Sequence, residues 1–218
     1  MEQKSATIVI FSTAYLPFLG GAETAIKGIT DYSDQFHYIL LTSRFDKKLP
    51  RAEKIGNVIV YRLGFGNSFD KYLLPFSSFL KFNSIRKNLH KPIIFWGMMA
   101  SYGSLGAWFL KFFYRRIPFL LTIQEGNKEW ERNRFWWRLI LKKVDYVTAI
   151  SSFLLGEVRK IGYRGEGQVV PNGVDIQKFI RSSDQVLGRM TGHIIISVSR
   201  LVYKNGIDIL EKAFEIVK

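Results

Sequence analysis

Two basic residues near the C-terminal end, Arg200 and Lys204, have the type and spacing to hold a phosphate. The apolar block 193–198 before them is rich in Ile and Val and is typical of a buried parallel strand. Apolar residues at helical spacing after them predict a helix that begins near Asn205. A helix N-terminus favours an anion, so this stretch predicts a phosphate site. The alternative is an ordinary strand–helix turn whose basic residues are solvated.

A pair of glycines, Gly20 and Gly21, follows the first predicted strand in the stretch TAYLPFLGGAE. Glycines let the backbone approach a ligand closely, and a helix is predicted to begin directly after this pair. The spacing differs from GxGxxG, so it indicates no dinucleotide. The alternative is a tight turn in which these glycines supply positive φ angles.

Polar residues also follow two later predicted strands. Gln124 and Glu125 follow the strand at 119–123. A glutamine can orient a hydroxyl but cannot take a proton, so Glu125 is the side chain of this loop that could act as a base. The alternative for Glu125 is an exposed loop acid. Ser151 and Ser152 are predicted to cap a helix rather than to bind a ligand.

The elements that must position these residues alternate between strands and helices. Strands are predicted at residues 7–12, 38–42, 58–62, 93–96, 119–123, 146–150 and 168–170. Helical patterns fit between most of them, including one that ends at Gly162. This alternation predicts a doubly wound parallel sheet of the α/β class with right-handed crossovers. Ligands in such sheets bind at the carboxyl ends of the strands, where the loops described above lie.

Two segments resemble a known family. PNGVDIQKF (171–179) and SRLVYKNGIDILEKAF (199–214), together with the GG loop, resemble the retaining glycosyltransferases of the GT-B fold, family 4 or glycosyl transferases group 1. The resemblance covers the whole chain. It implies an N-terminal Rossmann-like acceptor-side domain at 1–170, an interdomain linker at 171–192 and the start of a nucleotide-sugar-binding Rossmann-like domain at 193–218.

The resemblance also implies roles for individual residues. Donor-phosphate contacts are expected from Gly20, Gly21, Arg200, Lys204, Asn205 and Gly206, with Arg200 and Lys204 as the catalytic residues. The acceptor side is expected at Glu23, Gln124 and Glu125. Two positions depart from the family pattern. Gln124 stands where many members have a histidine, and Asn205 stands where a basic residue is usual, so Lys204 would act from a shifted position. Asn205, three residues before Asp208, also suits a helix cap.

The implied reaction moves a sugar from a nucleoside-diphosphate sugar to a lipid-linked or saccharide acceptor, with retention at the anomeric carbon. Negative charge grows on the departing diphosphate, and fixed Arg and Lys charges with a helix N-terminus stabilise it without a metal. In this family the acceptor hydroxyl attacks from the face that the diphosphate leaves, and the phosphate takes the proton. No protein nucleophile and no cofactor are therefore expected.

The composition indicates an anionic partner. The 218 residues include 32 Lys and Arg against 18 Asp and Glu, a net charge of +14, which favours nucleotide phosphates, acidic lipid head groups or nucleic acid. No nucleic-acid-binding module is recognised, so nucleic acid is not expected. The chain has no cysteine and its three histidines lie far apart, so neither a disulfide nor a metal site is predicted.

No membrane span or signal peptide is predicted. Residues 1–5 are polar, and a strand follows at once. The uncharged stretch 93–110 is interrupted by small residues and predicts strand, turn and helix rather than a span. A cytoplasmic location is expected, with peripheral contact to the cytoplasmic membrane face as an option.

One basic and aromatic segment, 128–143, could make such a contact. It carries Arg134, Arg138 and Lys142 at helical spacing. The far side of the same helix would hold Trp130, Trp137 and Leu141. One interpretation is a helix that packs on the core and exposes a solvated basic face. The other is an interfacial contact with an anionic membrane, because many members of the resembling family act there on lipid-linked acceptors.

The second domain is predicted to be incomplete. A Rossmann-like domain needs about 150 residues, whereas 193–218 supply one strand and one helix. The chain alone is therefore expected to be inactive, with the donor half supplied by further chain or by a separate C-terminal half. Two functions stay open: a glycosyltransferase, and a non-catalytic acceptor- or membrane-binding module.

Overall fold

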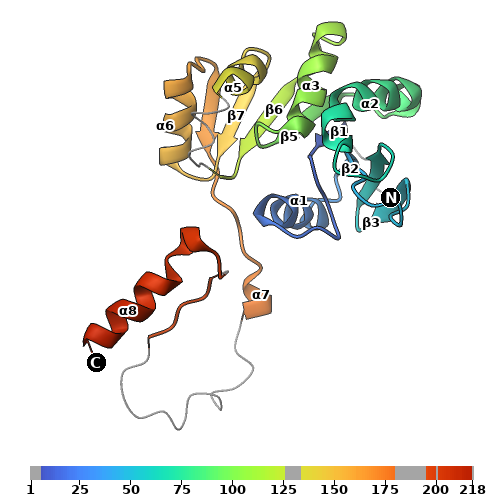
Figure 1. Cartoon of the computed structure of the whole chain (residues 1–218). Helices are drawn as coiled ribbons and strands as arrows, with labels where there is room; N and C mark the ends of the chain where they lie inside the picture. Colours follow the sequence, from blue (N-terminus) through green and yellow to red (C-terminus); the bar gives the residue numbers. More distant parts are fainter. Residues whose placement is uncertain (1–5, 126–133, 180–194, 200, 218) are drawn as a thin grey trace. The chain divides into compact units, whose positions relative to one another are not determined.

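The structure is a computed structural model that describes residues 6–125, 134–179, 195–199 and 201–217. The chain divides into two units, Met1–Gly173 and Val174–Lys218. Unit 1 is an α/β sheet protein of the Rossmann-like kind, with helices on both faces of one eight-stranded sheet (Figure 1). The predicted fold class of this part is confirmed.

The sheet has the order β3-β4-β2-β1-β5-β6-β7-β8. Its strands are β1 Ala6–Phe11, β2 Phe36–Ser43, β3 Ala52–Ile55, β4 Val58–Leu63, β5 Ile93–Met98, β6 Phe119–Ile123, β7 Tyr146–Ala149 and β8 Glu166–Val169. All neighbours are parallel except β3 and β4, which form an antiparallel hairpin at the edge. Seven strands were predicted from apolar runs. β3 was not, because the charged residues Glu53 and Lys54 stand in the middle of its sequence AEKI.

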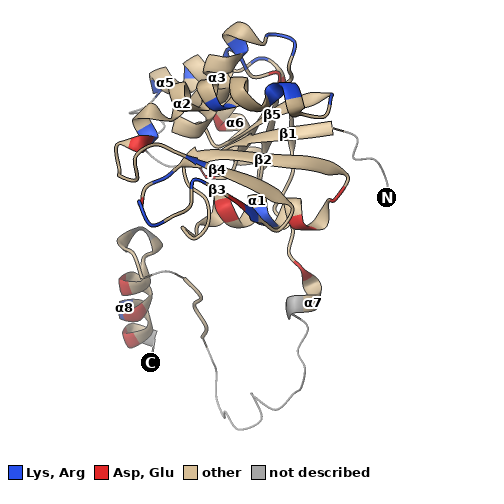
Figure 2. Cartoon of the chain, turned by 90° about the vertical axis from the view of Figure 1, so that its right-hand side faces the viewer, with Lys and Arg blue, Asp and Glu red and all other residues tan. Residues whose placement is uncertain are grey.

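The helices lie on the two faces of the sheet in unequal numbers. α1, Gly21–Tyr32, covers one face, whereas the other carries α2 Asp70–Ile85, α3 Tyr102–Phe113, α5 Arg134–Leu141 and α6 Ser152–Ile161 (Figures 1 and 2). A short turn, η1 Arg86–Asn88, follows α2. Alternate residues of each central strand point to opposite faces and form two apolar clusters. Val9 belongs to the larger cluster, under the four helices, and Ile10 to the cluster under α1.

The predicted ends of α6 are confirmed. The Ser151 hydroxyl accepts a hydrogen bond from the Leu154 N–H at 3.3 Å, which caps the first turn. Gly162 ends the helix with φ 118°, in the left-handed region where glycine is favoured. Residues 93–110 form β5, a turn and most of α3, as predicted. Within the described residues, no helix combines the length and the apolar character that crossing a membrane requires.

Unit 2 is described by its helical segments, α7 Ile176–Phe179, η3 Tyr203–Asn205 and α8 Ile207–Val217. The predicted strand at 193–198 is wrong in its described part, because residues 195–199 have no regular secondary structure. Val198 is 94% exposed. A strand needs a partner for its N–H and C=O groups, and the described residues of unit 2 include no other strand.

Candidate functional site

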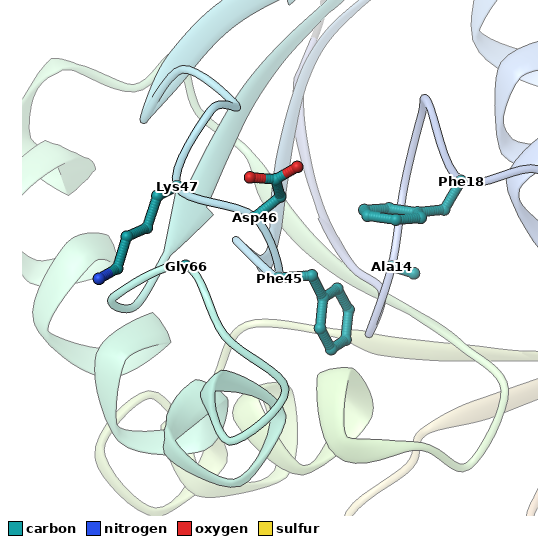
Figure 3. A pocket seen from close by; sticks show the side chains of 6 residues that line it. All are labelled: Ala14, Phe18, Phe45, Asp46, Lys47 and Gly66. Carbon is teal, nitrogen blue, oxygen red and sulfur yellow. The ribbon is translucent and has the colours of Figure 1, made fainter.

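Beyond the carboxyl ends of β1, β2 and β4 lies a cavity of about 680 Å³ that is open to solvent. Its lining comes from the three loops that follow these strands: Ala14, Phe18, Phe45, Asp46, Lys47 and Gly66. Figure 3 shows Phe18 and Phe45 reaching toward one another from two of these loops, whereas the Lys47 side chain points away from both rings. This position, beyond the carboxyl ends of parallel strands, is where α/β sheets bind ligands.

Two aromatic rings and one carboxylate give the cavity its chemical character. The rings of Phe18 and Phe45 meet edge to face, with centroids 5.7 Å apart. Phe45 has φ 52°, a conformation that is unusual for a residue other than glycine and that recurs at functional sites. The Asp46 carboxylate accepts the Lys48 N–H through Oδ1 at 2.8 Å. Its Oδ2 has no hydrogen-bond partner among the described residues.

A buried cation, Arg62 of β4, joins the loop after β1 to the hairpin beside it. Its side chain is 1% exposed and forms an ion pair with Glu53 of β3. Its guanidinium also donates to the Leu16 carbonyl at 2.5 Å and to the Pro50 carbonyl at 3.4 Å. Two of the loops that line the cavity are therefore attached to one fixed side chain.

The third loop is held by Asp70, which is fully buried at the start of α2. Its carboxylate accepts the N–H groups of Phe65, Gly66 and Asn67, at 2.9, 2.7 and 3.2 Å. Gly66 has φ 87°, and a Cβ there would come within 2.6 Å of the Lys47 nitrogen. Only glycine fits this close approach, which keeps the loop after β4 against the loop after β2.

The topological switch point of the sheet lies beside the cavity, between β1 and β5. The Thr13 carbonyl accepts the Ser43 N–H at 3.2 Å, and its hydroxyl accepts the Gly103 N–H at 3.1 Å. Met99, directly after β5, has φ 63° and is the second non-glycine residue with positive φ among those described. Thr13, in the loop after β1, is thus bonded to the end of β2 and to the first turn of α3.

The glycine pair lies where it was expected, but the tight-turn alternative is wrong. Gly20 precedes α1 with φ −146°, an extended conformation, and Gly21 has no positive φ. A Cβ on Gly20 would lie 2.5 Å from an oxygen of Glu23, whereas one on Gly21 would meet nothing within 4 Å. The half-buried Glu23 therefore folds back over Gly20, and no side-chain hydrogen bond caps the N-terminus of α1.

Gln124 pairs with a residue that the sequence did not connect to it. Its amide and that of Asn172, in the PNG motif, donate to each other's carbonyl oxygens at 2.9 and 2.7 Å. The pair joins the end of β6 to the segment after β8. Glu125 follows as an exposed residue, and its predicted role as a base stays a prediction.

Apart from the glycine pair, the residues expected at the donor diphosphate lie in unit 2. Arg200 lies outside the described residues. Lys204 and Asn205 belong to η3. Gly206 precedes α8 with φ 62°, a left-handed conformation that favours glycine at this position. The carbonyl of Gly206 accepts the first helical N–H groups of α8, from Ile209 and Leu210. The helix begins at Ile207, which confirms the predicted start near Asn205.

The basic stripe of α5 faces the end of α6. Arg134 Nη2 donates to the Lys160 carbonyl at 3.3 Å, and Arg138 Nε donates to the Ile161 carbonyl at 3.2 Å. Lys142 is exposed and follows the helix. The other side of α5 buries Trp137, Ile140 and Leu141, as a core-facing helix requires, while Trp130 lies outside the described residues. Membrane contact by α5 stays a prediction.

The sequence interpretation missed the cavity lining and the residues that hold it. The signal was present, since Ala14, Phe45 and Gly66 all follow predicted strands and ligands bind at strand carboxyl ends. Arg62 and Asp70, which hold the lining loops, carry no such signal, because the sequence does not reveal that a charged residue is buried. Among the described residues, no group of three or more His, Cys, Asp or Glu residues could hold a metal ion.

Comparison with known proteins agrees with this architecture. A family model described as Glycosyltransferase Family 4 matches residues 19–178. No curated protein matches the sequence. A solved structure of sucrose-phosphate synthase from Thermosynechococcus elongatus is similar, with a TM-score of 0.57 and 14% identity, over 79% of this chain and 92% of that chain. At this identity the likeness shows the fold alone. Because the family model spans most of the sequence, the chain belongs to glycosyltransferase family 4.

Proposed function

We propose that this glycosyltransferase moves a sugar from a nucleoside-diphosphate sugar to a saccharide or lipid-linked acceptor, with retention and without a metal or cofactor. Unit 1 would bind the acceptor. The observation that carries this proposal is the cavity at the carboxyl ends of β1, β2 and β4, in a chain that belongs to glycosyltransferase family 4.

The cavity suits the glycan part of an acceptor. The apolar faces of Phe18 and Phe45 can pack on the C–H face of a sugar ring, and one Asp46 oxygen is already fixed by the Lys48 N–H. The remaining Asp46 oxygen would accept a hydroxyl of the acceptor. A few polar groups placed in an otherwise apolar cavity are typical of small-molecule sites, where they fix orientation.

The donor half of the reaction is assigned to Arg200 and Lys204. As the bond between the anomeric carbon and the diphosphate breaks, charge develops on the leaving oxygen. A fixed guanidinium stabilises that charge more in the transition state than in the ground state. The acceptor hydroxyl would lose its proton to the departing phosphate, so no side-chain base is needed.

Transfer is tested on the chain joined to, or mixed with, a complete C-terminal domain and a panel of UDP- and GDP-sugars. Arg200→Ala should lower kcat by about a hundredfold, the scale seen when one preorganised donor is removed, with a smaller effect on donor KM. Lys212→Ala, on α8, is the matched control. An unchanged kcat for Arg200→Ala in a folded protein would contradict the assignment.

The acceptor side has its own test in the same assay. Phe45→Ala and Asp46→Asn should raise the acceptor KM and leave the donor KM unchanged, because both residues line the cavity of unit 1. Arg51→Gln, an exposed charge outside the cavity lining, is the control. If Phe45→Ala and Asp46→Asn instead raise only the donor KM, the cavity belongs to the donor.

A non-catalytic acceptor-binding module is the second candidate, favoured by the fact that unit 1 forms the whole cavity by itself. This candidate predicts saccharide binding that is blocked by Phe45→Ala. It also predicts no turnover when the complete donor domain is supplied. Equilibrium binding and the transfer assay on the same preparation distinguish the two.

A further inference from the structure

A second cavity, of about 710 Å³, lies between α5 and the loop that joins α6 to β8. One wall comes from α5 and the turn that follows it, and the other comes from residues 161–165. Both helices belong to unit 1 and lie side by side there (Figure 1). The volume is within the range of small-molecule sites. This space is called the α5–α6 cavity below, and it shares no lining residue with the cavity of Phe18 and Phe45.

The α5–α6 cavity lies at the amino ends of the strands. Residues 142–145 lead from α5 into β7, and residues 162–165 lead from α6 into β8. Because β7 and β8 are parallel, both segments lie at the same edge of the sheet. Substrates of α/β sheets bind at the opposite edge, beyond the carboxyl ends, where the cavity of Phe18 and Phe45 lies. A ligand in the α5–α6 cavity would therefore not compete with an acceptor there.

Three cations from three parts of the chain line the α5–α6 cavity. They are Arg138 of α5, Lys142 directly after α5, and Arg164 shortly before β8. The described residues that line the cavity include no Asp or Glu. Asp145, the acid nearest to Lys142 in the sequence, is outside the lining and forms an ion pair with Lys111 at 2.7 Å. Charges of one sign in a concave site concentrate ions of the opposite sign, so the cavity favours an anion.

The three cations have hydrogen-bond donors left for a ligand. Arg138 Nε donates to the Ile161 carbonyl at 3.2 Å, which fixes the guanidinium, while its two Nη groups donate to none of the described residues. The side chains of Lys142 and Arg164 form no hydrogen bond or ion pair with the part of the chain that the structure describes. A guanidinium that is held at one end and free at the other suits the paired oxygens of a phosphate.

The loop that carries Arg164 is fixed by contacts on its far side. Gly162 has φ 118° and ends α6. The buried Tyr163 donates its hydroxyl to the Glu166 carbonyl at 2.8 Å, and Arg159 Nη1 donates to the Tyr163 carbonyl at 3.4 Å. The backbone on both sides of Arg164 is therefore held before any ligand arrives, which lowers the entropic cost of binding.

We propose that the α5–α6 cavity binds a soluble compound that carries a phosphate or diphosphate group. Arg138, Lys142 and Arg164 would donate to the phosphate oxygens. The apolar part of the lining, which includes Phe135 and Leu139, leaves room for an organic group beside them. Such a ligand would tie α5 to the loop before β8. The inference stands on the cavity and its charges, and does not depend on the proposed glycosyl transfer.

The first experiment titrates the full chain with sodium pyrophosphate in a calorimeter. Every sample carries Arg200→Gln with Lys204→Gln, so that the phosphate site proposed for the donor does not contribute. One pyrophosphate should bind per chain. Lys142→Gln with Arg164→Gln should weaken its binding at least about tenfold, because two of the three charged donors are lost. Far-UV circular dichroism checks the fold of this variant, whose replaced side chains bond to none of the described residues.

The matched control removes the same two residue types at the other edge of the sheet. Arg51→Gln with Lys54→Gln changes exposed side chains beside and on β3, whereas the α5–α6 cavity adjoins β8. Both double variants lose two positive charges, so a general effect of net charge would be equal in the two. The control should keep the affinity for pyrophosphate within about twofold of the parent.

A second measurement locates the ligand without a loss of binding. Pyrophosphate should shift the backbone amide resonances of residues 138–144 and 161–165. Residues 44–48, in the loop after β2, should keep theirs. A third measurement distinguishes a soluble phosphate from a lipid head group: the double variant at Lys142 and Arg164 should sediment with vesicles that contain phosphatidic acid to the same extent as the double variant at Arg51 and Lys54.

Four outcomes overturn the proposal. The first is no binding of pyrophosphate by the chain, and the second is an equal loss of affinity in both double variants. The third is amide shifts that lie outside the residues of the α5–α6 cavity. The fourth is a change of Lys142 and Arg164 that abolishes vesicle binding and leaves the pyrophosphate affinity intact, since the partner of these cations would then be a lipid.

Discussion

Arg62 bonds two of the three loops that line the cavity. Replacing it with Met would leave the Leu16 and Pro50 carbonyls and the Glu53 carboxylate without their shared donor. We expect the free energy of unfolding to fall by about 2–4 kcal/mol, because a partly buried network would lose its only cation. Arg62→Lys should recover part of the loss, since an ammonium keeps the charge but not the planar fork.

Urea unfolding measures this effect, with Arg51→Met as the control because Arg51 is an exposed arginine of the same hairpin. The control should stay within about 0.5 kcal/mol of the parent. Equal losses for Arg51→Met and Arg62→Met would mean that the ion pair and the carbonyl bonds do not hold the loops.

Tyr15 makes stability depend on pH in the alkaline range. Burial, first, and the charge of Asp31, second, raise the pKa of Tyr15 to about 12, against the opposing effect of the Thr30 hydroxyl. Between pH 10 and 12 the unfolded chain releases the tyrosine proton while the folded chain retains it. Stability is therefore lost as pH rises above about 10.

We expect Tyr15→Phe to remove the part of the loss of stability above about pH 10 that comes from this tyrosine. The measurement is the free energy of unfolding at several pH values from 8 to 11.5. Tyr32→Phe, at an exposed position of α1, should leave the slope unchanged. A Tyr15→Phe slope that matches the parent would show that Tyr15 ionises equally in both states.

At the scale of elements, α5 and α6 are joined by hydrogen bonds from arginines to a helix end. Cations near a helix C-terminus satisfy its last carbonyls and interact favourably with its dipole. Arg138→Met should therefore lower stability by about 1 kcal/mol. Lys142→Met, from the same sequence stripe, should change it by less than about 0.5 kcal/mol, because among the described contacts the Lys142 side chain donates to no carbonyl of α6.

Chemical denaturation of both variants measures the difference, and salt adds a second check. Because salt screens the dipole interaction, the penalty of Arg138→Met should shrink as ionic strength rises. Equal losses of stability in Arg138→Met and Lys142→Met would show that the stripe acts through its positive charge alone and not through hydrogen bonds to α6.

The pair of Gln124 and Asn172 is also an element-scale contact, because it ties the end of β6 to the PNG segment. A double-mutant cycle of Gln124→Ala and Asn172→Ala should give a coupling of about 0.5–1 kcal/mol, since the two hydrogen bonds between these amides are exposed to water. The readout is amide hydrogen exchange of Val170, which local opening controls. Additive effects of the two changes would contradict the coupling.

At the scale of the whole molecule, acceptor and donor functions are expected on different units. The described residues of unit 2 form helical segments and include no strand. We expect the 218-residue chain alone to show no measurable transfer or hydrolysis with UDP- or GDP-sugars. Adding a complete C-terminal domain should restore activity. Robust turnover by the chain alone would contradict this division of function.

The sequence by itself determined the order of elements in unit 1. Apolar runs marked the central strands β1, β2, β5 and β6, because a strand covered on both faces must be largely apolar. Ser151 and Gly162 marked the ends of α6, because capping and left-handed geometry act within a few neighbouring residues. The glycine pair was located correctly, although Glu23, rather than a positive φ, occupies the space beside Gly20.

Tertiary structure decided which distant residues meet. Phe18 and Phe45 come from two loops, Gln124 and Asn172 lie 48 positions apart, and Arg62 reaches back 46 positions to Leu16. No local pattern encodes these contacts, because sheet order determines which loops become neighbours. The same reason explains the segment 195–199: its apolar residues favour a strand, but strand pairing is a tertiary contact, and the described residues of unit 2 offer no partner.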